Sequence, residues 1–379
     1  MSGAAIDPVE LTQALIRLPS VTPDAEAPIV HLAALLEDAG FTCTRVDRGG
    51  IANLYARSGG HGPVLGFNGH VDVVPVGDLD NWTEDPFGGT IRDGVLYGRG
   101  ACDMKSGVAA WIAAAVAAAD TCPGSLVLAI TGDEEGAGVD GTAAILDWMA
   151  GTGERMDACI VGEPTCPARM GEMVKIGRRG SLTLRVVARG RQGHAAYPQN
   201  ARNPLHAMVD LLHRLTAAHL DDGTDRFDRT TVQITGFDCG NTANNVIPAT
   251  CRAMLNIRFN DAHSGLSLSD WLHERAREVS GATGVAFDLD IAISGESFVT
   301  APGRLTDIVQ RAVEAETGLI PVLSTSGGTS DARFVKDHCP VIELGLVGGT
   351  MHQVDERVEV EHVRQLTAIY SRVIRDFFG

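Results

Sequence analysis

Residues 64–72 read Val-Leu-Gly-Phe-Asn-Gly-His-Val-Asp, a short apolar run followed at once by a histidine and an aspartate. Turn residues bound the run Val64–Asn68, which therefore predicts a buried strand. Three other runs have the same character: Leu126–Thr131, Ala158–Val161 and Val341–Leu346. Helical stretches separate most of these runs. Such alternation predicts an α/β fold with a mostly parallel sheet and helices on both of its faces.

Side chains of metal-ligand type follow each predicted strand. His70 follows the first run, and Glu134, Glu163 and His352 follow the others. Open α/β sheets place their sites at the carboxyl ends of strands, so we expect these side chains at one edge of the sheet. Each has a simple structural alternative, such as a polar turn, a solvated acidic loop or a structural histidine. All the segments place a residue of ligand type at the same edge of the predicted sheet, which is improbable if each had only its structural alternative.

Three more carboxylates complete the candidate set. Asp72 lies two residues after His70 and can hold the far nitrogen of that imidazole. Asp103 lies just before an Ala-rich helix, where the alternative role is a helix cap. Glu135 ends the acidic run 133–135, whose charges repel one another at a buried sheet edge unless a cation compensates. Two imidazoles and three carboxylates, with one glutamate and one aspartate to spare, suffice for a two-metal hydrolytic site.

The pattern changes between about Gly180 and Ser294, where strands alternate apolar and polar residues as half-exposed strands do. The expected elements of this region are, in chain order, Ser181–Ala188, Pro204–His219, Thr231–Gly236, Ala253–Phe259, Leu266–Val279 and Val285–Ile293. The order strand, helix, strand, strand, helix, strand predicts a ferredoxin-like sandwich with one exposed sheet face. We therefore expect an inserted domain at 180–294, and a discontinuous catalytic domain at 1–179 and 295–379.

Composition narrows the class of protein. The chain has 379 residues, enough for two domains. Its net charge of −17 supplies no phosphate-neutralising surface, so no nucleic-acid partner is expected. Eight cysteines without a Cys-x-x-Cys pair argue against a disulfide framework and favour the reducing cytoplasm. No signal peptide is visible, and the apolar run Val108–Ala119 is too short for a bilayer, so it predicts a buried helix and no membrane partner.

Four segments together resemble the co-catalytic zinc amidohydrolases, a family that includes aminoacylases and acetylornithine deacetylases. These segments are Gly69–Pro75, Tyr97–Lys105, Asp133–Glu135 and Gly162–Thr165. The resemblance implies two Zn²⁺ ions per subunit, which Co²⁺ can replace. It also implies a cis peptide bond after Asp103.

The same resemblance implies a role for each candidate residue. One zinc ion is bound by His70 and Glu163, and the other by Glu135 and His352. The carboxylate of Asp103 bridges the two ions. Of the two spare carboxylates, Asp72 orients His70 and Glu134 is the general base.

Further segments are similar to those of succinyl-diaminopimelate desuccinylases within this family: Gly177–Ser181, Gly193–Pro198, Asn244–Pro248, Asn256–Phe259 and Thr325–Asp331. The similarity implies hydrolysis of N-succinyl-LL-2,6-diaminopimelate to succinate and LL-2,6-diaminopimelate, a step toward lysine and peptidoglycan precursors. The implied substrate-binding residues are Arg178, Ser181, His194, Tyr197, Asn244, Asn245, Arg258, Thr325 and Gly327. A physical argument favours Arg178, because a succinyl group ends in a carboxylate and arginine binds carboxylates through a planar fork.

The resemblance also implies a homodimer formed through the inserted domain. In that dimer, His194 and Asn245 of one subunit reach the active site of the other. His194 then stabilises the oxyanion of the reaction. The structural alternative for Gly193-His194 is a turn with a surface histidine.

One segment departs from the desuccinylase pattern. The family usually has an Asn-Ala-Thr type run before the last histidine, where this chain has Val347-Gly348-Gly349-Thr350-Met351-His352. The missing asparagine removes one polar contact to the substrate and leaves open another acyl group with a distal carboxylate.

Alternative functions remain open from the sequence. An acetylornithine deacetylase or another N-acyl-amino-acid amidohydrolase is the nearest, and the arginine pair at 178–179 argues against an acetyl substrate. A peptidase needs a pocket for a peptide chain, which the sequence neither shows nor excludes. A non-catalytic descendant that binds metal or amino acids is disfavoured by Glu134, which turnover needs and binding does not.

Overall fold

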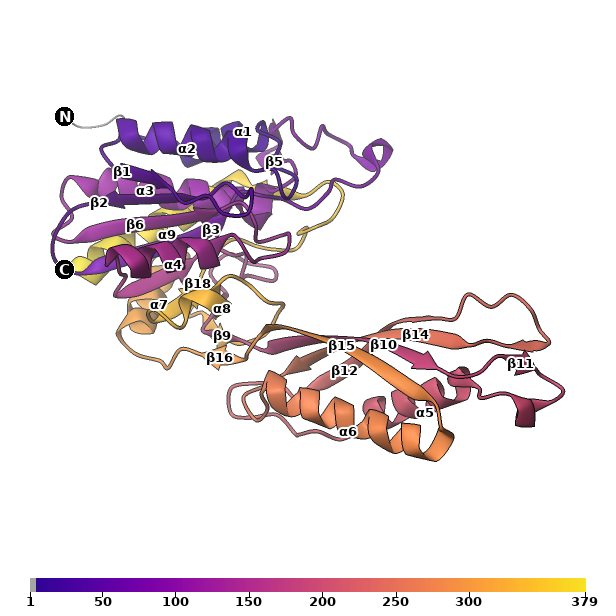
Figure 1. Cartoon of the computed structure of the whole chain (residues 1–379). Helices are drawn as coiled ribbons and strands as arrows, with labels where there is room; N and C mark the ends of the chain where they lie inside the picture. The colour runs from indigo at the N-terminus through magenta and orange to yellow at the C-terminus, as the bar shows by residue number, and fades with distance from the viewer. Residues whose placement is uncertain (1–4) are drawn as a thin grey trace. The chain divides into compact units, whose positions relative to one another are not determined.

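Internal contacts divide the protein into two units. We describe residues 5–379 of a computed structural model, shown in Figure 1. The first unit comprises the chain up to Gly177 together with Thr300–Ser324 and Ser330–Gly379. The second comprises Arg178–Val299 and Thr325–Thr329. The segment Thr325–Thr329, which the expected domain boundaries placed in the catalytic part, is thus associated with the second unit.

Eight strands form the main sheet of the first unit, in the spatial order β1-β2-β6-β3-β7-β18-β8-β17. The central strands β6, β3, β7 and β18 are parallel, whereas β1, β2 and β8 introduce antiparallel pairs. The strands are Thr42–Arg45 (β1), Leu54–Ser58 (β2), Ser125–Thr131 (β6), Val64–His70 (β3), Ala158–Val161 (β7), Val341–Glu343 (β18), Met173–Lys175 (β8) and Val322–Ser324 (β17). The α/β class is confirmed, although β18 ends before the predicted Leu346.

Helices cover both faces of this sheet, as predicted. One layer contains α1 (Pro8–Ile16), α2 (Glu26–Asp38), α3 (Ser106–Ala119), α7 (Arg304–Thr317) and α9 (Val360–Phe378), whose apolar residues share one core cluster. The other face carries α4 (Thr142–Thr152) and α8 (Ala332–Val335). Figure 1 shows α1 and α2 on one side of the sheet and α4 and α8 on the other.

Side-chain alternation along β3 connects both layers. Phe67 stacks on Trp111 with ring centroids 4.9 Å apart and meets Tyr370 edge-on at 6.0 Å. The next side chain, Asn68, points to the opposite face, where its Nδ2 donates to Oγ1 of Thr142 at 2.8 Å. The strand is therefore anchored on both faces immediately before His70.

The first two helices differ in whether a side chain caps their N-terminus. Asp7 caps α1, because its carboxylate accepts the amides of Val9 and Glu10 at 2.7 and 3.2 Å. Asp24 does not cap α2. Ala25 occupies the N-cap without a side-chain hydrogen bond, so Asp24 lies one residue too early.

The longest apolar helix lies in the core. Residues Ala101–Ala119 are long and apolar enough to cross a membrane by length and composition alone, but the qualifying stretch is 83% buried inside the protein. Core helices of globular proteins commonly have this composition. The burial agrees with the predicted buried helix at Val108–Ala119.

The second unit has the predicted order of strands and helices. Its sheet runs β12-β14-β10-β15 with every pair antiparallel. The elements are β10 (Gly180–Arg189), α5 (Pro204–Thr216), β12 (Thr231–Asp238), β14 (Thr250–Phe259), α6 (Gly265–Thr283) and β15 (Ala286–Gly295). Both helices pack on one face of the sheet around a separate apolar cluster. This arrangement matches the ferredoxin-like sandwich.

Short strands and turns complete the chain. The strands are β4 (Thr90–Arg92), β5 (Val95–Tyr97), β9 (Gly177–Arg178), β11 (Gly193–His194), β13 (Val246–Ile247), β16 (Phe298–Val299) and β19 (Arg357–Glu359). In the first unit, β19, β5 and β4 form a small antiparallel sheet. In the second, β11 pairs with β13.

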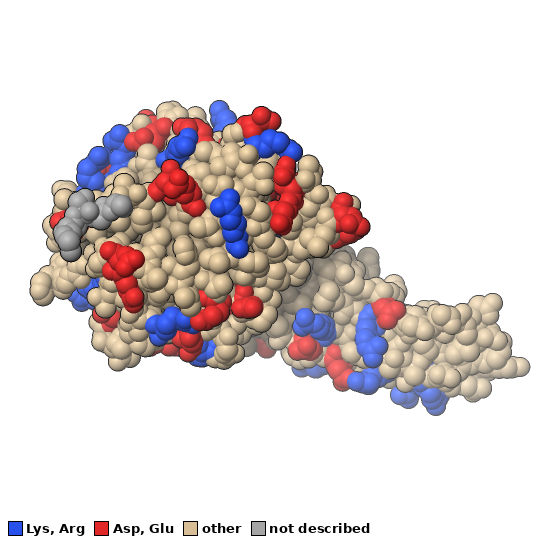
Figure 2. All heavy atoms as spheres, turned by 90° about the horizontal axis from the view of Figure 1, so that it is seen from above, with Lys and Arg blue, Asp and Glu red and all other residues tan. Residues whose placement is uncertain are grey.

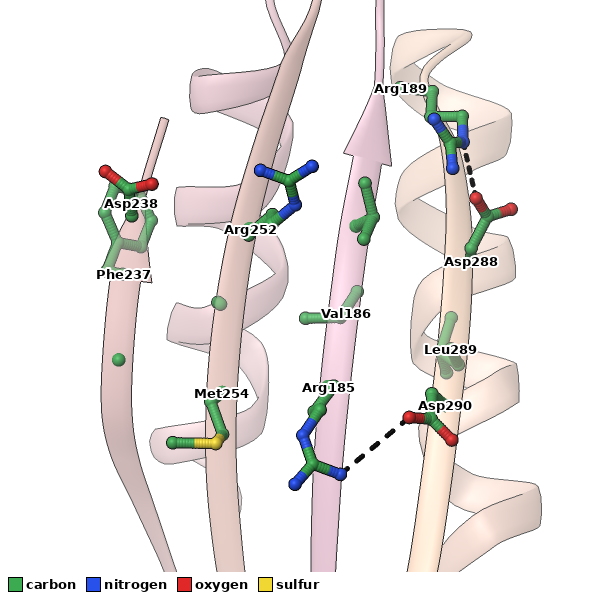
Figure 3. A pocket seen from close by; sticks show the side chains of 13 residues that line it. Arg185, Val186, Arg189, Phe237, Asp238, Arg252, Met254, Asp288, Leu289 and Asp290 are labelled. Atoms are coloured by element: carbon green, nitrogen blue, oxygen red, sulfur yellow. Dashed lines mark hydrogen bonds and ion pairs between the residues drawn. The ribbon is translucent and has the colours of Figure 1, made fainter. Parts of the chain in front are cut away.

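The other face of the second unit's sheet is partly exposed, with Phe237 at 48% and Met254 at 37%, and Figure 3 draws side chains that lie on it. A hollow of about 550 Å³ there is lined by side chains of all four strands. Arg189 donates to Asp288 at 2.5 Å, and Arg185 lies 3.8 Å from Asp290. The residues that the sequence nominated for substrate binding do not line this hollow. Its charges are largely paired, so we do not assign it to the reaction.

The acidic excess of the chain belongs largely to its surface. On the face that Figure 2 shows, basic and acidic residues are interspersed. Arg45, for example, contacts Glu26 at 2.6 Å and Asp47 at 2.8 Å. Exposed pairs of this kind contribute little to stability. The buried carboxylates described next are a separate group.

Candidate metal centre

The ends of the central strands bring five candidate ligands together. His70 ends β3, and Glu135, Glu163 and His352 lie in the loops after β6, β7 and β18. Nε2 of His70 is 3.2 Å from Oδ1 of Asp103 and 3.7 Å from Oε1 of Glu163. Nε2 of His352 is 3.2 Å from Oδ2 of Asp103 and 2.8 Å from Oε1 of Glu135. The two oxygens of Asp103 therefore face different histidines, each with its own carboxylate.

This donor set fits a pair of divalent cations. Imidazole nitrogens and carboxylate oxygens are the usual ligands of zinc in catalytic sites. Ligand atoms of His70, Asp103 and Glu135 lie within 4.8 Å of one another, and so do those of His70, Glu134 and Glu163. The carboxylate of Asp103 directs one oxygen toward His70 and the other toward His352, so it could bridge two cations.

The electrostatics of the cluster point the same way. Burial, together with Asp331 and Glu135, raises the pKa of Glu134 to about 8. Burial and the charge of Asp103 raise the pKa of Glu163 well above its usual range. Hydrogen bonds to Asp103 and Glu135 raise the pKa of His352 to about 10. Burial contributes to the shifts of the two glutamates, and the surrounding negative charge contributes to all three; bound cations would neutralise that charge.

Asp72 lies beside His70, but its contacts differ from those expected. Its backbone carbonyl oxygen is 2.9 Å from Nδ1 of His70, whereas its carboxylate is 3.6 Å away. Because a carbonyl only accepts, Nδ1 carries the proton and Nε2 is free to bind a cation. The carboxylate of Asp72 instead accepts the amides of Glu134 and Glu135 at 3.2 and 3.0 Å. Asp72 thus orients the histidine through its main chain and the two glutamates through its side chain.

The acidic run after β6 divides into two parts. Asp133 turns away from the cluster and accepts the amides of Val139 and Asp140 at 3.0 and 3.2 Å. It stabilises its own loop, which leaves Glu134 and Glu135 to face the other candidate ligands.

Asp103 lies in the turn that leads into α3. The helix itself begins at Ser106 with Lys105 at the N-cap, so the helix-cap alternative for Asp103 does not hold. The peptide bond between Asp103 and Met104 is cis, as the resemblance implied.

In the second unit, Arg178 is held against the loop 325–329. Its guanidinium is largely buried, and Nη1 donates to the carbonyl oxygens of Gly328 and Ser326 at 3.2 and 3.5 Å. Gly327 permits this approach, because a Cβ there would lie 2.3 Å from Nη1 of Arg178. Thr325 anchors the start of the loop by donating from its hydroxyl to the carbonyl oxygen of Arg226.

Two further arginines have unsatisfied donors. Arg258 is opposite Ser181 across strands β14 and β10, and its Nε donates to Asn256 at 2.9 Å. Burial and the charges of Arg179 and Arg178 lower the pKa of Arg258. Among the described residues, Nη1 of Arg258 and Nε of Arg179 are buried without a hydrogen-bond partner. Clustered guanidinium groups with free donors are suited to an anionic ligand.

His194, Tyr197, Asn244 and Asn245 form a separate, exposed group in the second unit. The amide of Ala195 donates to the carbonyl oxygen of Asn245 at 2.9 Å, and the rings of His194 and Tyr197 lie 5.7 Å apart. The amide of Ala196 donates to Nδ1 of His194 at 3.0 Å. The Nε2 atom of this imidazole therefore carries the proton and presents a donor to solvent.

The structure does not bring the arginine group and the histidine group of one chain together. Arg178 precedes β10 and His194 follows it, and this strand is 10 residues long. Ten extended residues span about 33 Å, far more than the length of a diamino diacid.

Two buried residues of the first unit were missed from the sequence. Glu356 and Arg99 are 1% and 2% exposed and form an ion pair at 2.7 Å. A weak signal existed. Arg99 lies inside the segment Tyr97–Lys105 that carried the family resemblance, and Glu356 lies four residues after His352.

Comparisons with known proteins place the chain in a family. Residues 66–376 match peptidase family M20/M25/M40. A succinyl-diaminopimelate desuccinylase of Cereibacter sphaeroides (strain ATCC 17029 / ATH 2.4.9) is 61% identical over 378 residues, which cover 99% of this chain and 100% of that protein. The protein of that name from Roseobacter denitrificans is 58% identical over 379 residues, 99% of this chain and 100% of its own length.

Solved structures share the fold at low sequence identity. The M20 family metallo-carboxypeptidase Sso-CP2 of Sulfolobus solfataricus has a TM-score of 0.82 at 16% identity, covering 97% of this chain and 98% of its own. The YXEP protein of Bacillus subtilis, described as a dinuclear metal binding peptidase from the M20 family, has a TM-score of 0.75 at 15% identity, covering 98% and 97%. The sequence match over most of its length shows that this chain is a hydrolase that belongs to peptidase family M20/M25/M40.

Proposed function

We propose that this chain hydrolyses N-succinyl-LL-2,6-diaminopimelate to succinate and LL-2,6-diaminopimelate. The observation that carries the proposal is the placement of Asp103, whose two oxygens face two histidine–carboxylate pairs. The desuccinylase names of relatives at about 60% identity over the full length support the substrate. We further propose two Zn²⁺ ions per subunit, replaceable by Co²⁺, a homodimer and a cytoplasmic location.

The proposed metal ligands follow the geometry. His70 and Glu163 would hold one ion, His352 and Glu135 the other, and Asp103 both. When bound, a pair of divalent ions supplies Lewis acidity that polarises a carbonyl and lowers the pKa of water.

Glu134 moves the proton of the reaction. Its backbone amide is fixed by Asp72, and its carboxylate lies within 4.8 Å of the ligand atoms of His70 and Glu163. The carboxylate takes a proton from the attacking water as the C–O bond forms at the amide carbonyl carbon. It returns that proton to the nitrogen as the C–N bond breaks, which releases the amine. Nε2–H of His194 from the partner subunit donates to the oxyanion.

The arginine group binds the succinyl carboxylate. Arg178 and Arg258 supply the charge, and the orphan Nη1 of Arg258 supplies a donor. An acetyl group has no charge to offer this cluster, so burying it there would leave the donors unpaired. We place Ser181, Thr325 and Gly327 around this carboxylate because they hold or border the arginines, and Tyr197 and Asn244 beside His194.

Replacing Arg178 with alanine tests the substrate assignment. We expect KM for N-succinyl-LL-2,6-diaminopimelate to rise about 10- to 100-fold, the effect of losing a charge-assisted hydrogen-bond pair. Hydrolysis of the N-acetyl analogue should change little. The matched control is Arg189→Ala, which removes an arginine from an exposed ion pair of the same unit. Equal effects of Arg178→Ala on both substrates would contradict the assignment.

A second prediction concerns His194. Since one chain separates its histidine and arginine groups by the length of β10, we expect His194 to serve the site of the other subunit. His194→Ala and Glu134→Ala homodimers should each lose most activity. When the two variants are mixed in equal amounts and exchange subunits, half of the dimers are hybrids. Each hybrid has one intact site, which combines Glu134 of one subunit with His194 of the other, so the mixture should recover about a quarter of wild-type activity. No recovery after subunit exchange, in hybrids verified by mass spectrometry, would show that His194 does not act across the dimer.

A further inference from the structure

Glu356 is the acceptor at the centre of a buried network in the first unit. It directly precedes β19 and is 1% exposed. Its Oε2 accepts from the amide of Gly100 at 3.0 Å and from Nη1 of Arg99 at 2.7 Å. Its Oε1 accepts from the amides of Cys102 and Asp103 at 3.0 and 3.1 Å. One carboxylate thus receives four donors from a single short segment.

That segment carries the bridging candidate, and the loop of Glu356 carries a second ligand. The carboxylate of Asp103 lies 3.2 Å from Nε2 of His352, which is four residues before Glu356 in the chain. Thr350 closes this loop, because its hydroxyl accepts the amide of Arg357 and donates to that residue's carbonyl oxygen, both at 3.1 Å. Glu356 therefore connects the backbone segment that positions Asp103 to the loop that positions His352.

Arg99 ties the same two segments from the other side. It is 2% exposed, and Nη1 also donates to the carbonyl oxygen of Gln353 at 3.2 Å. The guanidinium lies 5.2 Å from the ring centroid of Trp82. Its charge is compensated by Glu356, so the pair is held inside the protein rather than at the surface.

The network requires an ionised carboxylate at position 356. All four partners are N–H donors, and only an ionised carboxylate offers acceptors alone. A glutamine there has the same shape but turns an NH₂ group toward at least one of these donors. It would be expected to push the segment 99–103 away from the loop of His352 rather than leave the spacing unchanged.

We propose that Glu356 is a positioning residue that sets the spacing between Asp103 and His352, and hence how two metal ions would share the carboxylate of Asp103. It touches neither substrate nor the reacting atoms. The inference rests on the proposed two-metal function and extends it to a residue outside the ligand set. Residues that hold metal ligands in place typically change metal affinity by about 10- to 100-fold when replaced.

The test compares Glu356→Gln with Glu359→Gln, an exposed glutamate at the end of the strand β19 that follows Glu356. Zinc binding is measured by calorimetry on metal-free protein, and the geometry of the site by the visible spectrum of the Co²⁺ form. For Glu356→Gln we expect the affinity for the second ion to fall about 10- to 100-fold and the Co²⁺ bands to shift. The value of kcat should fall about 100-fold while KM stays within about threefold, since the residue acts on the transition state through the ions. Glu359→Gln should resemble the wild type.

A second variant separates positioning from folding. Glu356→Asp keeps the charge but shortens the reach, and we expect it to restore part of the metal affinity lost in Glu356→Gln. Amide hydrogen exchange across residues 99–103 should be faster in both variants. Unchanged zinc affinity and Co²⁺ spectrum in both variants, with only a lower melting temperature, would overturn the inference. If the wild type itself bound fewer than two ions, the two-metal function would fail instead, so the two failures are distinguishable.

Discussion

Glu134→Ala is expected to lower kcat by about 10²- to 10⁴-fold while the protein keeps both metal ions, because general acid–base catalysis contributes an effect of this size. The residue is adjacent to Glu135, which contacts His352 at 2.8 Å and is the better placed ligand. The measurements are kcat on the succinyl substrate and zinc content per chain after dialysis. Glu134→Gln, which keeps the shape without the base, should be as inactive as the alanine variant.

The informative failure would be loss of metal. Glu134 shares a group of close donor atoms with His70 and Glu163, so a role as ligand is the competing assignment. If Glu134→Ala released an ion while Glu135→Ala kept both, the roles of the two glutamates would be reversed. The backbone amides of both glutamates donate to the carboxylate of Asp72, so either assignment uses the same loop conformation.

Asp103→Ala is expected to have the second large effect, because it removes the group that we propose both ions share. Affinity for both zinc ions should fall, and activity should drop at least about 10³-fold, since the metals supply several kcal/mol of transition-state stabilisation. His352→Ala should weaken one ion much more than the other. Calorimetric titration of metal-free protein with zinc distinguishes the two patterns, with Asp80→Asn, an exposed aspartate, as the control.

One intact site in Asp103→Ala would contradict the bridging role. Asp103 would then be a terminal ligand of a single ion. The distances of 3.2 Å from its two oxygens to the two histidines favour the shared arrangement.

Much of the fold could be predicted because its signals are local. The runs at Val64–Asn68, Leu126–Thr131 and Ala158–Val161 are apolar and bounded by turns, and they form the centre of the sheet. The position of His70 followed from a general rule about the carboxyl ends of parallel strands. Family resemblance then supplied the proposed division of ligands between two ions, which the rule could not supply.

The features that were missed depend on contacts between distant segments. Glu356 accepts a hydrogen bond from the amide of Cys102, which is 254 residues away in the sequence, and no periodic pattern in the sequence predicts such a bond. The side chain of Asp72 binds the amides of Glu134 and Glu135, because those amides face it once β3 and β6 lie side by side. The association of the loop Thr325–Thr329 with the second unit also depends on such contacts, because the loop lacks apolar residues that would show where it packs.

The measurement that tests the central claim most directly is hydrolysis by the zinc-loaded wild-type protein of N-succinyl-LL-2,6-diaminopimelate beside N-acetylornithine. The account predicts a kcat/KM at least about 100-fold higher for the succinyl substrate, because its distal carboxylate can accept from the buried, unpartnered donors of Arg179 and Arg258 and an acetyl group cannot. Equal rates, or a preference for the acetyl substrate, would contradict the substrate assignment and leave a two-metal amide hydrolase whose acyl specificity lies elsewhere, with Gly348 the first position to examine.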